Sequence, residues 1–216
     1  MPDPSTPEAE RLYERVRRDL DREHGASAWL RSRSTRGRAF LLSVASLALV
    51  ASSGWMLLGP ERVFVHGATT WLSLAGLVVL AGLAMAAMLR PLYLPAWSGT
   101  SRSLLVSGIG LGALASIAMV GDGTLGHVGP LRCLWIGATV GAPIFGLALL
   151  VDRQPRRIGV FRALVGGLVG GLAVQLVCPG AGIAHLLVEH FGTVVATTAL
   201  FVGLGGVLER SAGRTR

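Results

Sequence analysis

Long apolar runs recur along most of this chain, and they restrict its fold more than any other feature. Runs of eighteen or more residues with few or no charges follow one another after residue 38, and a helix needs about twenty apolar residues to cross ~30 Å of hydrocarbon. Of the 216 residues, 51% are hydrophobic and 15% are charged, whereas soluble domains have roughly 25% charged residues. An ordinary soluble domain is therefore excluded. We expect an all-α membrane protein, a bundle of six transmembrane helices.

The apolar runs divide the chain into three parts. We expect a cytoplasmic tail over residues 1–38, a six-span membrane domain over 39–208 and a cytoplasmic C-terminus over 209–216. The predicted spans are 39–58, 68–89, 103–120, 133–151, 159–177 and 184–208. The first run begins too late for an ordinary cleavable signal peptide, so the tail is expected to stay attached.

Arginine is distributed very unevenly between the segments that connect these spans. Six spans put both termini on one side, and eighteen of the twenty Arg residues fall on that side, leaving only Arg62 and Arg132 on the other. Basic residues are retained on the cytoplasmic side of a membrane. We therefore expect a multi-pass protein of the bacterial inner membrane with both termini in the cytoplasm. The same placement accounts for the net charge of +8 without direct binding to nucleic acid.

The tail contains a short amphipathic helical pattern. Leu12, Val16 and Leu20 recur every four residues, with Tyr13 beside them and charged residues between, which predicts a helix with a narrow apolar stripe. Such a stripe cannot form a core alone, so the helix must dock on a protein partner, lie on the membrane or stay largely unfolded. Residues 31–38 then form a predicted basic linker to the first span.

Small and polar residues in the fifth span predict close packing between helices. Gly166, Gly167, Gly170 and Gly171 form two overlapping pairs with small-xxx-small spacing, which lets helix backbones approach closely in a membrane. Gln175 is expected to bridge two helices by hydrogen bonding. We expect packing, rather than a pore or substrate path, to explain these glycines.

Side chains that can bind a metal gather on the outer side of the predicted topology. Both Cys residues and four of the five His residues fall in or beside the three outer loops. The set is His66, His127, Cys133, Cys178, His185 and His190. Thiolate and imidazole ligands together suit copper or zinc, whereas a pair of thiols can form a redox switch. Moderately polar residues also accumulate at span ends without any function, so this alternative stays open.

The segment before the last span concentrates three of these candidates. Cys178 opens a Pro-Gly turn, and His185 and Glu189, four residues apart, share one face if an α-helix follows. On that assumption His190 lies about 100° around the helix from Glu189. Two ligands and a carboxylate can then converge on one site, or the segment is a turn with solvated interfacial side chains.

Features that would indicate an enzyme or an ion-coupled transporter are missing from the sequence. We expect no span to contain a buried charged residue of the kind that marks proton relays and ion paths. The sequence also has no phosphate-binding P-loop, GxSxG nucleophile elbow or HExxH pair. We therefore expect no enzymatic activity.

The arrangement as a whole resembles the integral-membrane anti-sigma factors of the NrsF and CarR type. The resemblance lies in the charged amphipathic tail, the six Gly- and Ala-rich spans, and Cys178-Pro179 followed by spaced His185 and His190 before the last span. It implies that the tail sequesters an extracytoplasmic-function sigma factor and releases it on an envelope, oxidative or metal signal. Cys133 and Cys178 would match the outer cysteines of that family. The tail departs from zinc-binding anti-sigma domains, because it has no Cys or His motif beyond His24.

Under this resemblance, the partner-binding residues are Leu12, Tyr13, Val16 and Leu20, and the sensing residues are the outer Cys and His set. The alternative is a metal- or haem-handling inner-membrane protein, in which copper, zinc or haem binds at the outer face and the tail only guides insertion. A membrane enzyme acting on lipids or quinones is the weakest alternative, because it would need catalytic acids within the spans.

Overall fold

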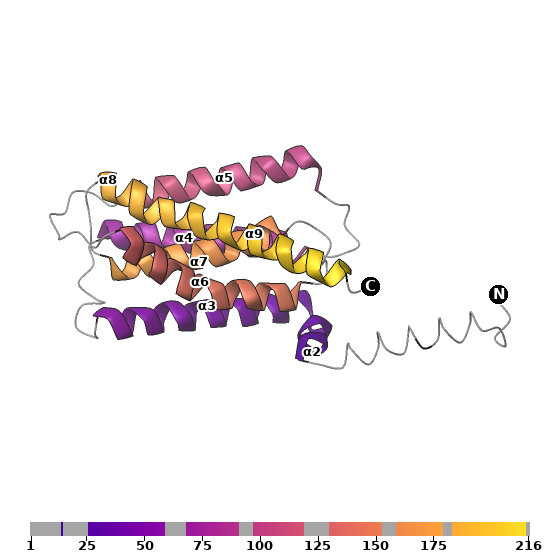
Figure 1. The fold of residues 1–216 in the computed structure, drawn as a ribbon. Coiled ribbons are helices and arrows are strands. Elements are labelled where there is room, and N and C mark those ends of the chain that lie inside the picture. The colour runs from indigo at the N-terminus through magenta and orange to yellow at the C-terminus, as the bar shows by residue number, and fades with distance from the viewer. Residues whose placement is uncertain are drawn as a thin grey trace, which may run out of the picture.

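The computed structural model describes residue 14 and residues 26–58, 68–90, 97–118, 130–152, 159–178 and 183–214. The regular elements within these residues are all helical, and six helical stretches among them are long and apolar enough to cross a membrane. The bounds are α2 Ala26–Ser32, α3 Thr35–Leu58, α4 Ala68–Met88, α5 Gly99–Ala118, α6 Pro130–Val151, α7 Val160–Val177, α8 Ile183–His185, the π-helix η1 Leu186–Phe191 and α9 Gly192–Arg214 (Figure 1). The chain is therefore a multi-pass helical membrane protein, and this part of the predicted fold is confirmed.

Each predicted span coincides with one long helix or, for the last span, with the run from α8 to α9. The main differences lie at the helix ends. The first helix begins at Thr35 and the last ends at Arg214, beyond the predicted span ends at 39 and 208. The predicted basic linker is helical over most of its length, because α2 covers its beginning and α3 its end. The predicted tail helix with Leu12, Tyr13, Val16 and Leu20 lies outside the described residues.

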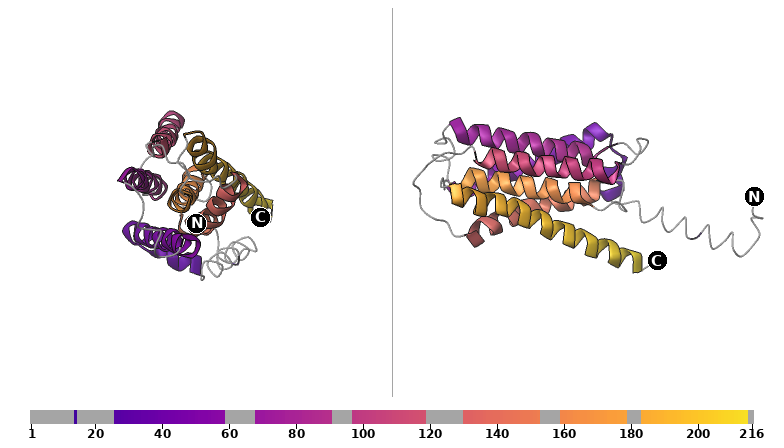
Figure 2. Two further views of the ribbon diagram at one scale, coloured as in Figure 1. Left: turned by 90° about the vertical axis from the view of Figure 1, so that its left-hand side faces the viewer. Right: turned by 90° about the horizontal axis from the view of Figure 1, so that it is seen from above.

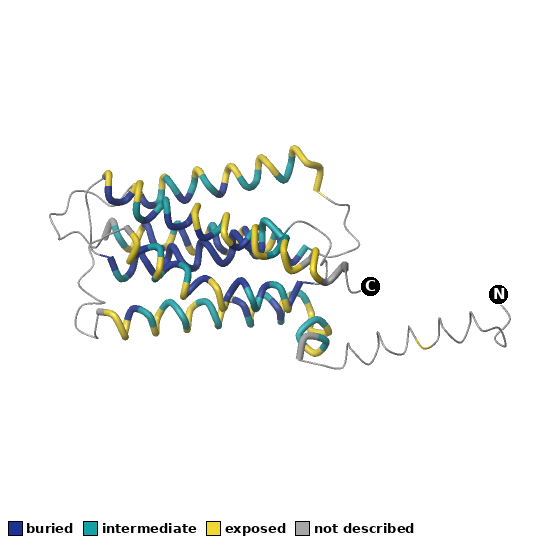
Figure 3. Tube along the Cα trace, in the orientation of Figure 1, coloured by how far each residue is buried: buried dark blue, intermediate teal, exposed yellow. Residues whose placement is uncertain are grey.

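Helix α7 lies at the centre of the bundle. It packs against α3, α4, α6 and α9 (Figure 2), and every residue from Arg162 to Leu176 is buried. The burial colouring shows the same contrast, with dark blue through the middle of the bundle and yellow on its outer helices (Figure 3). A transmembrane helix so enclosed has almost no contact with lipid, so its polar Gln175 needs only protein partners.

The glycines of α7 allow its neighbours to approach this closely. A methyl group on Gly170 would meet the backbone of Gly137 in α6, and one on Gly167 would meet Thr198 in α9. Without a hydrophobic driving force between helices in lipid, van der Waals contact at small residues provides much of the packing energy. The predicted packing role of these glycines is confirmed.

The outer surface of the bundle is apolar, as contact with lipid requires. Large side chains are exposed there on several helices, among them Phe40, Leu47, Leu72, Leu104, Leu111 and Leu200. Trp55, Trp71 and Trp135 are also exposed, and each lies near the end of its helix, where indole rings favour the lipid headgroup level. The exposed belt and its aromatic margins fit a bilayer around the bundle.

The two ends of the bundle differ in their polar contacts. α2 and the last turns of α9 lie at one end, which we call the α2 end, and α8 lies at the opposite end, which we call the π-turn end (Figure 1). At the α2 end, Arg31 Nε donates to the Leu150 carbonyl oxygen at 3.2 Å, and Arg38 Nη1 donates to the Val151 carbonyl oxygen at 3.1 Å. Both arginines thus bind the last carbonyl groups of α6, where positive charge also complements the helix dipole.

A buried ion pair near the same end contradicts one sequence prediction. Arg162, within α7, donates from Nε to Asp152 Oδ2 at 2.6 Å, and both residues are buried. The prediction that no span contains a buried charged residue is therefore wrong. Arg162 lies in the first turn of α7 and Asp152 directly follows α6, so each charge is compensated by the other at the point where the two helices meet.

Candidate metal centre

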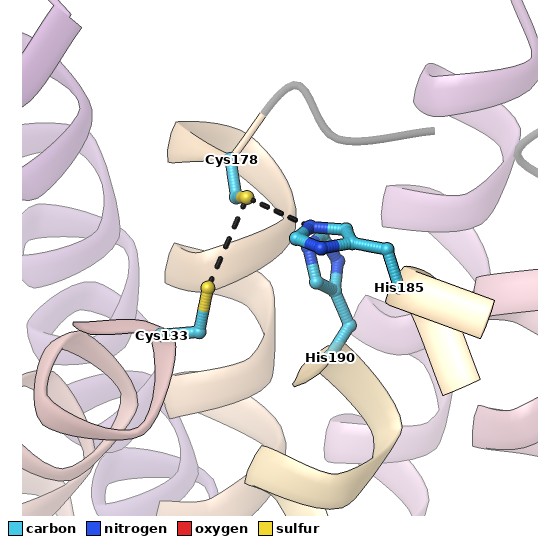
Figure 4. A group of neighbouring side chains, drawn as sticks. All are labelled: Cys133, Cys178, His185 and His190. Atoms are coloured by element: carbon cyan, nitrogen blue, oxygen red, sulfur yellow. Dashed lines mark hydrogen bonds between the residues drawn. The ribbon is translucent and has the colours of Figure 1, made fainter. Parts of the chain in front are cut away.

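Four of the predicted ligands meet at the π-turn end of the bundle. Cys133 lies in the first turn of α6, Cys178 directly follows α7, His185 ends α8, and His190 lies in η1. All four residues are buried. Figure 4 shows the two cysteine side chains and the two imidazole rings directed toward one another from these different elements. The site therefore joins the beginning of α6 to the end of α7 and to η1, and Cys133 precedes Cys178 by 45 residues.

The potential ligand atoms are closely spaced. Cys133 Sγ lies 3.8 Å from Cys178 Sγ, and Cys178 Sγ lies 3.2 Å from His185 Nε2. One ligand atom from each of the four residues falls within 4.8 Å of every other. Both cysteines are free thiols. A bare metal ion fits among donors at these distances, whereas a haem macrocycle needs far more space around its axial ligands.

An oxygen atom lies beside the second ring nitrogen of each imidazole, a hydrogen-bonding amide oxygen for His190 and an ion-pairing carboxylate oxygen for His185. Gln175 Oε1 in α7 is 2.6 Å from His190 Nδ1, and Glu189 Oε2 is 3.0 Å from His185 Nδ1. Metal-binding histidines nearly always donate their second ring N–H to such an acceptor, which fixes the tautomer and the ring orientation. The contact of Gln175 also confirms the prediction that this residue bridges two helical segments.

His190 Nε2, the ring nitrogen on the opposite side from Gln175, is a buried polar atom. It has no hydrogen-bond partner among the described residues, and His190 has 0% of its surface exposed. A buried nitrogen without a partner is costly. A metal ion bound to this atom would remove that cost.

The π-helical turn explains how both histidines reach one site. In η1 the backbone hydrogen bonds join residues five apart, as between the Gly192 N–H and the Leu187 carbonyl oxygen, instead of four apart as in an α-helix. His190 therefore lies over His185, and their ring centroids are 5.1 Å apart. An α-helix was expected here, with His190 about 100° around the helix from Glu189 and able to converge with it on one site. Isolated π-turns occur frequently at functional sites.

The structure separates the predicted site residues into two groups. Cys133, Cys178, His185 and His190 come together, and Glu189 lies beside them with its Oε2 atom 3.7 Å from Cys133 Sγ. The alternative of solvated interfacial histidines is wrong, because His185 and His190 are buried. His66 and His127, the other two predicted ligands, lie outside the described residues.

Comparisons of the chain with protein-family models, with curated proteins and with solved structures gave no match. The chemistry of the site is therefore inferred from its own residues and geometry.

Proposed function

We propose that this chain is a metal-responsive protein of the bacterial inner membrane, which binds a transition-metal ion through Cys133, Cys178, His185 and His190. The observation that carries this proposal is the convergence of four buried ligand atoms within 4.8 Å of one another. Two thiols and two imidazoles form the donor set that zinc and copper prefer. The arginine asymmetry supports an orientation with the π-turn end on the outer side, where an envelope metal would reach it.

The metal proposal is tested on the full-length protein, purified in mild detergent and analysed for bound elements. We expect roughly one zinc or copper ion per chain, as for a closed four-ligand site. Loss of a hydrogen-bond partner of a metal ligand typically weakens metal binding by about 10–100-fold. Cys178→Ser removes a ligand itself, so it should weaken metal binding by more than this. The matched control is Thr197→Val, because Thr197 is buried in α9 and, among the described residues, its hydroxyl bonds within that helix, to the carbonyl oxygens of Thr193 and Val194.

This experiment has a clear negative outcome. A wild-type protein that stays metal-free after incubation with zinc or with reduced copper would overturn the proposal. So would equal metal binding by the wild-type protein and by Cys178→Ser.

The second candidate function is that of a membrane-bound anti-sigma factor. It is supported by the apolar stripe of the tail and by the resemblance to NrsF- and CarR-type proteins. Two contacts in the structure favour it further. The segment that leads from the tail into the membrane is fixed to α6, through Arg31 to Leu150 and Arg38 to Val151, and Cys133 lies at the other end of the same helix. A signal at the outer site thus has a direct structural route to the tail.

The anti-sigma proposal predicts a partner that depends on the tail. A tagged full-length chain isolated from its native membrane should co-purify with an extracytoplasmic-function sigma factor, identified by mass spectrometry. Deletion of residues 2–30, or replacement of Leu12, Val16 and Leu20 with Asp, should abolish co-purification, because charge on the stripe prevents docking in an apolar groove. A sigma factor that is retained by both variants, or found with neither variant nor wild type, would contradict this function.

A further inference from the structure

We propose that the ion is Zn²⁺ in a closed tetrahedral site, and that Gln175 and Glu189 are positioning residues for its two histidine ligands. This inference rests on the proposed metal-binding function. The ligand atoms are Cys133 Sγ, Cys178 Sγ and the Nε2 atoms of His185 and His190. All four positions are then occupied by protein, so the ion is a resident part of the bundle.

The spacing of the two sulfur atoms matches one edge of a zinc-centred tetrahedron. With Zn–S bonds of about 2.3 Å, two thiolates at tetrahedral corners lie about 3.8 Å apart, and the observed distance is 3.8 Å. Two thiolates opposite one another on a linear ion would lie about 4.6 Å apart at the same bond length. The sulfurs of Cys133 and Cys178 are therefore placed as neighbouring corners and not as a linear pair.

The distance from sulfur to nitrogen agrees with the same geometry. With a Zn–N bond of about 2.0–2.1 Å, a tetrahedral S···N edge is about 3.5 Å. Cys178 Sγ and His185 Nε2 are 3.2 Å apart, so an ion entering the site would separate these two atoms by only a few tenths of an ångström. One ligand atom from each of the four residues, a ring nitrogen for each histidine, lies within 4.8 Å of every other. Small side-chain movements are thus sufficient to bring all four ligands to bonding distance.

Gln175 determines which nitrogen of His190 faces the ion. An amide oxygen only accepts hydrogen bonds, so the 2.6 Å contact with Gln175 Oε1 makes Nδ1 the protonated nitrogen of His190. Nε2 then carries a free lone pair, and this is the buried atom without a partner among the described residues. The side chain of Gln175 thereby prepares His190 to bind a cation.

Glu189 has the corresponding position behind His185. Its carboxylate oxygen Oε2 lies 3.0 Å from Nδ1, an ion-pair contact and not a hydrogen bond, while Nε2 of the same ring lies 3.2 Å from Cys178 Sγ. Such carboxylate–histidine–zinc arrangements increase the basicity of the ligand and fix its orientation. Glu189 and His190 are consecutive residues of η1, so this one segment supplies both a positioning group and a ligand.

The charges of the ligands also favour a divalent ion over a monovalent one. Binding converts two thiols into thiolates and releases two protons, and the two negative charges on sulfur neutralise the divalent ion. A monovalent ion with two thiolates would instead leave a net negative charge beside the Glu189 carboxylate, which burial disfavours. This favours Zn²⁺ over Cu⁺.

The test combines X-ray absorption spectroscopy of the zinc-loaded full-length protein with a competition assay against a coloured chelator. We expect two sulfur and two nitrogen scatterers around zinc. Gln175→Leu should weaken zinc binding by about 10–100-fold. Gln175→Glu should restore most of that loss, because its carboxylate also accepts a hydrogen bond from the Nδ1–H group of His190. Thr197→Val is again the control and should bind zinc as the wild type does.

The outcomes distinguish this inference from the metal-binding proposal itself. A wild-type protein that binds neither zinc nor copper overturns both. Tight copper binding with only sulfur scatterers, or zinc bound with oxygen ligands in place of imidazole, overturns the zinc site but leaves metal binding intact. Unchanged zinc affinity in Gln175→Leu removes the positioning role of Gln175.

Discussion

A Gly170→Val variant is expected to lose most of the stability of the bundle. Any side chain at this position would enter the backbone of α6, since even a single methyl group would lie 3.0 Å from the carbonyl carbon of Gly137 and 3.2 Å from its Cα atom. The backbone of α6 cannot relieve this overlap by a rotamer change, as the end of a flexible side chain could. Overpacking of a well-packed core typically costs about 1–3 kcal/mol, and we expect at least the upper value here because α6 and α7 must separate.

The measurement for this prediction is thermal unfolding in detergent, followed by size-exclusion chromatography of the heated sample. The control is Gly82→Val in α4, where an added Cβ atom meets nothing within 4 Å. The control should unfold at the wild-type temperature or slightly above it, because glycine is a poor residue in a helix interior. Equal unfolding temperatures for the two variants would mean that α6 and α7 are not in close contact.

Replacement of Asp152 with leucine should also cause a large loss of stability. Removing one partner of a buried ion pair costs about 3–5 kcal/mol in proteins, because the other charge keeps its desolvation penalty. Here Asp152→Leu removes the carboxylate that accepts the 2.6 Å hydrogen bond from Arg162 Nε. The free energy of unfolding in detergent should fall by an amount in this range.

A double-mutant cycle tests the physical reason for this loss. When both partners are replaced by apolar residues, the penalty is expected to disappear or even reverse. The variant with Asp152→Leu and Arg162→Leu together should therefore be more stable than Asp152→Leu alone. If the two substitutions instead add independently, the pair does not interact across the meeting point of α6 and α7.

The apolar runs were sufficient to predict the membrane fold, but they could not predict where each helix ends. The fifth span was predicted at 159–177 and the helix covers Val160–Val177, because Arg157 and Gly159 precede this run closely and Pro179 and Gly180 follow it closely. Hydropathy defines the part of a helix that lies in lipid. It does not detect helical turns that continue into the headgroup region or water, as α3 does at Thr35 and α9 at Arg214.

The sequence predicted which residues form the candidate site but not how they are arranged. The arrangement depends on contacts between helices that are separated along the chain. Topology alone placed Cys133 on the same side of the membrane as Cys178, His185 and His190. Their mutual distances and burial depend on how α6 and α7 pack, which no local pattern contains. The π-turn was also missed, because the sequence 186–191 has no residue that distinguishes a π-helix from an α-helix.

The buried arginine shows a different weakness of sequence patterns. Arg162 was counted among the basic residues of a connecting loop, although it falls within the predicted span 159–177. Its position in α7 is stable because the fold brings Asp152, ten residues earlier, against it. Counting charges by segment assigns a side of the membrane, but it cannot show which charges become paired.

The central position of α7 has a consequence for the synthesis of the protein. Of the six membrane-spanning helices, α7 is synthesised fifth and α9 last. α7 therefore enters the membrane before one of the helices that enclose it has been made. His185 and His190 follow Cys133 and Cys178 in the chain and directly precede α9, so all four proposed ligands are present only after residue 190 has been made. If an ion binds to all four, it would by mass action stabilise the folded bundle over chains interrupted before that residue.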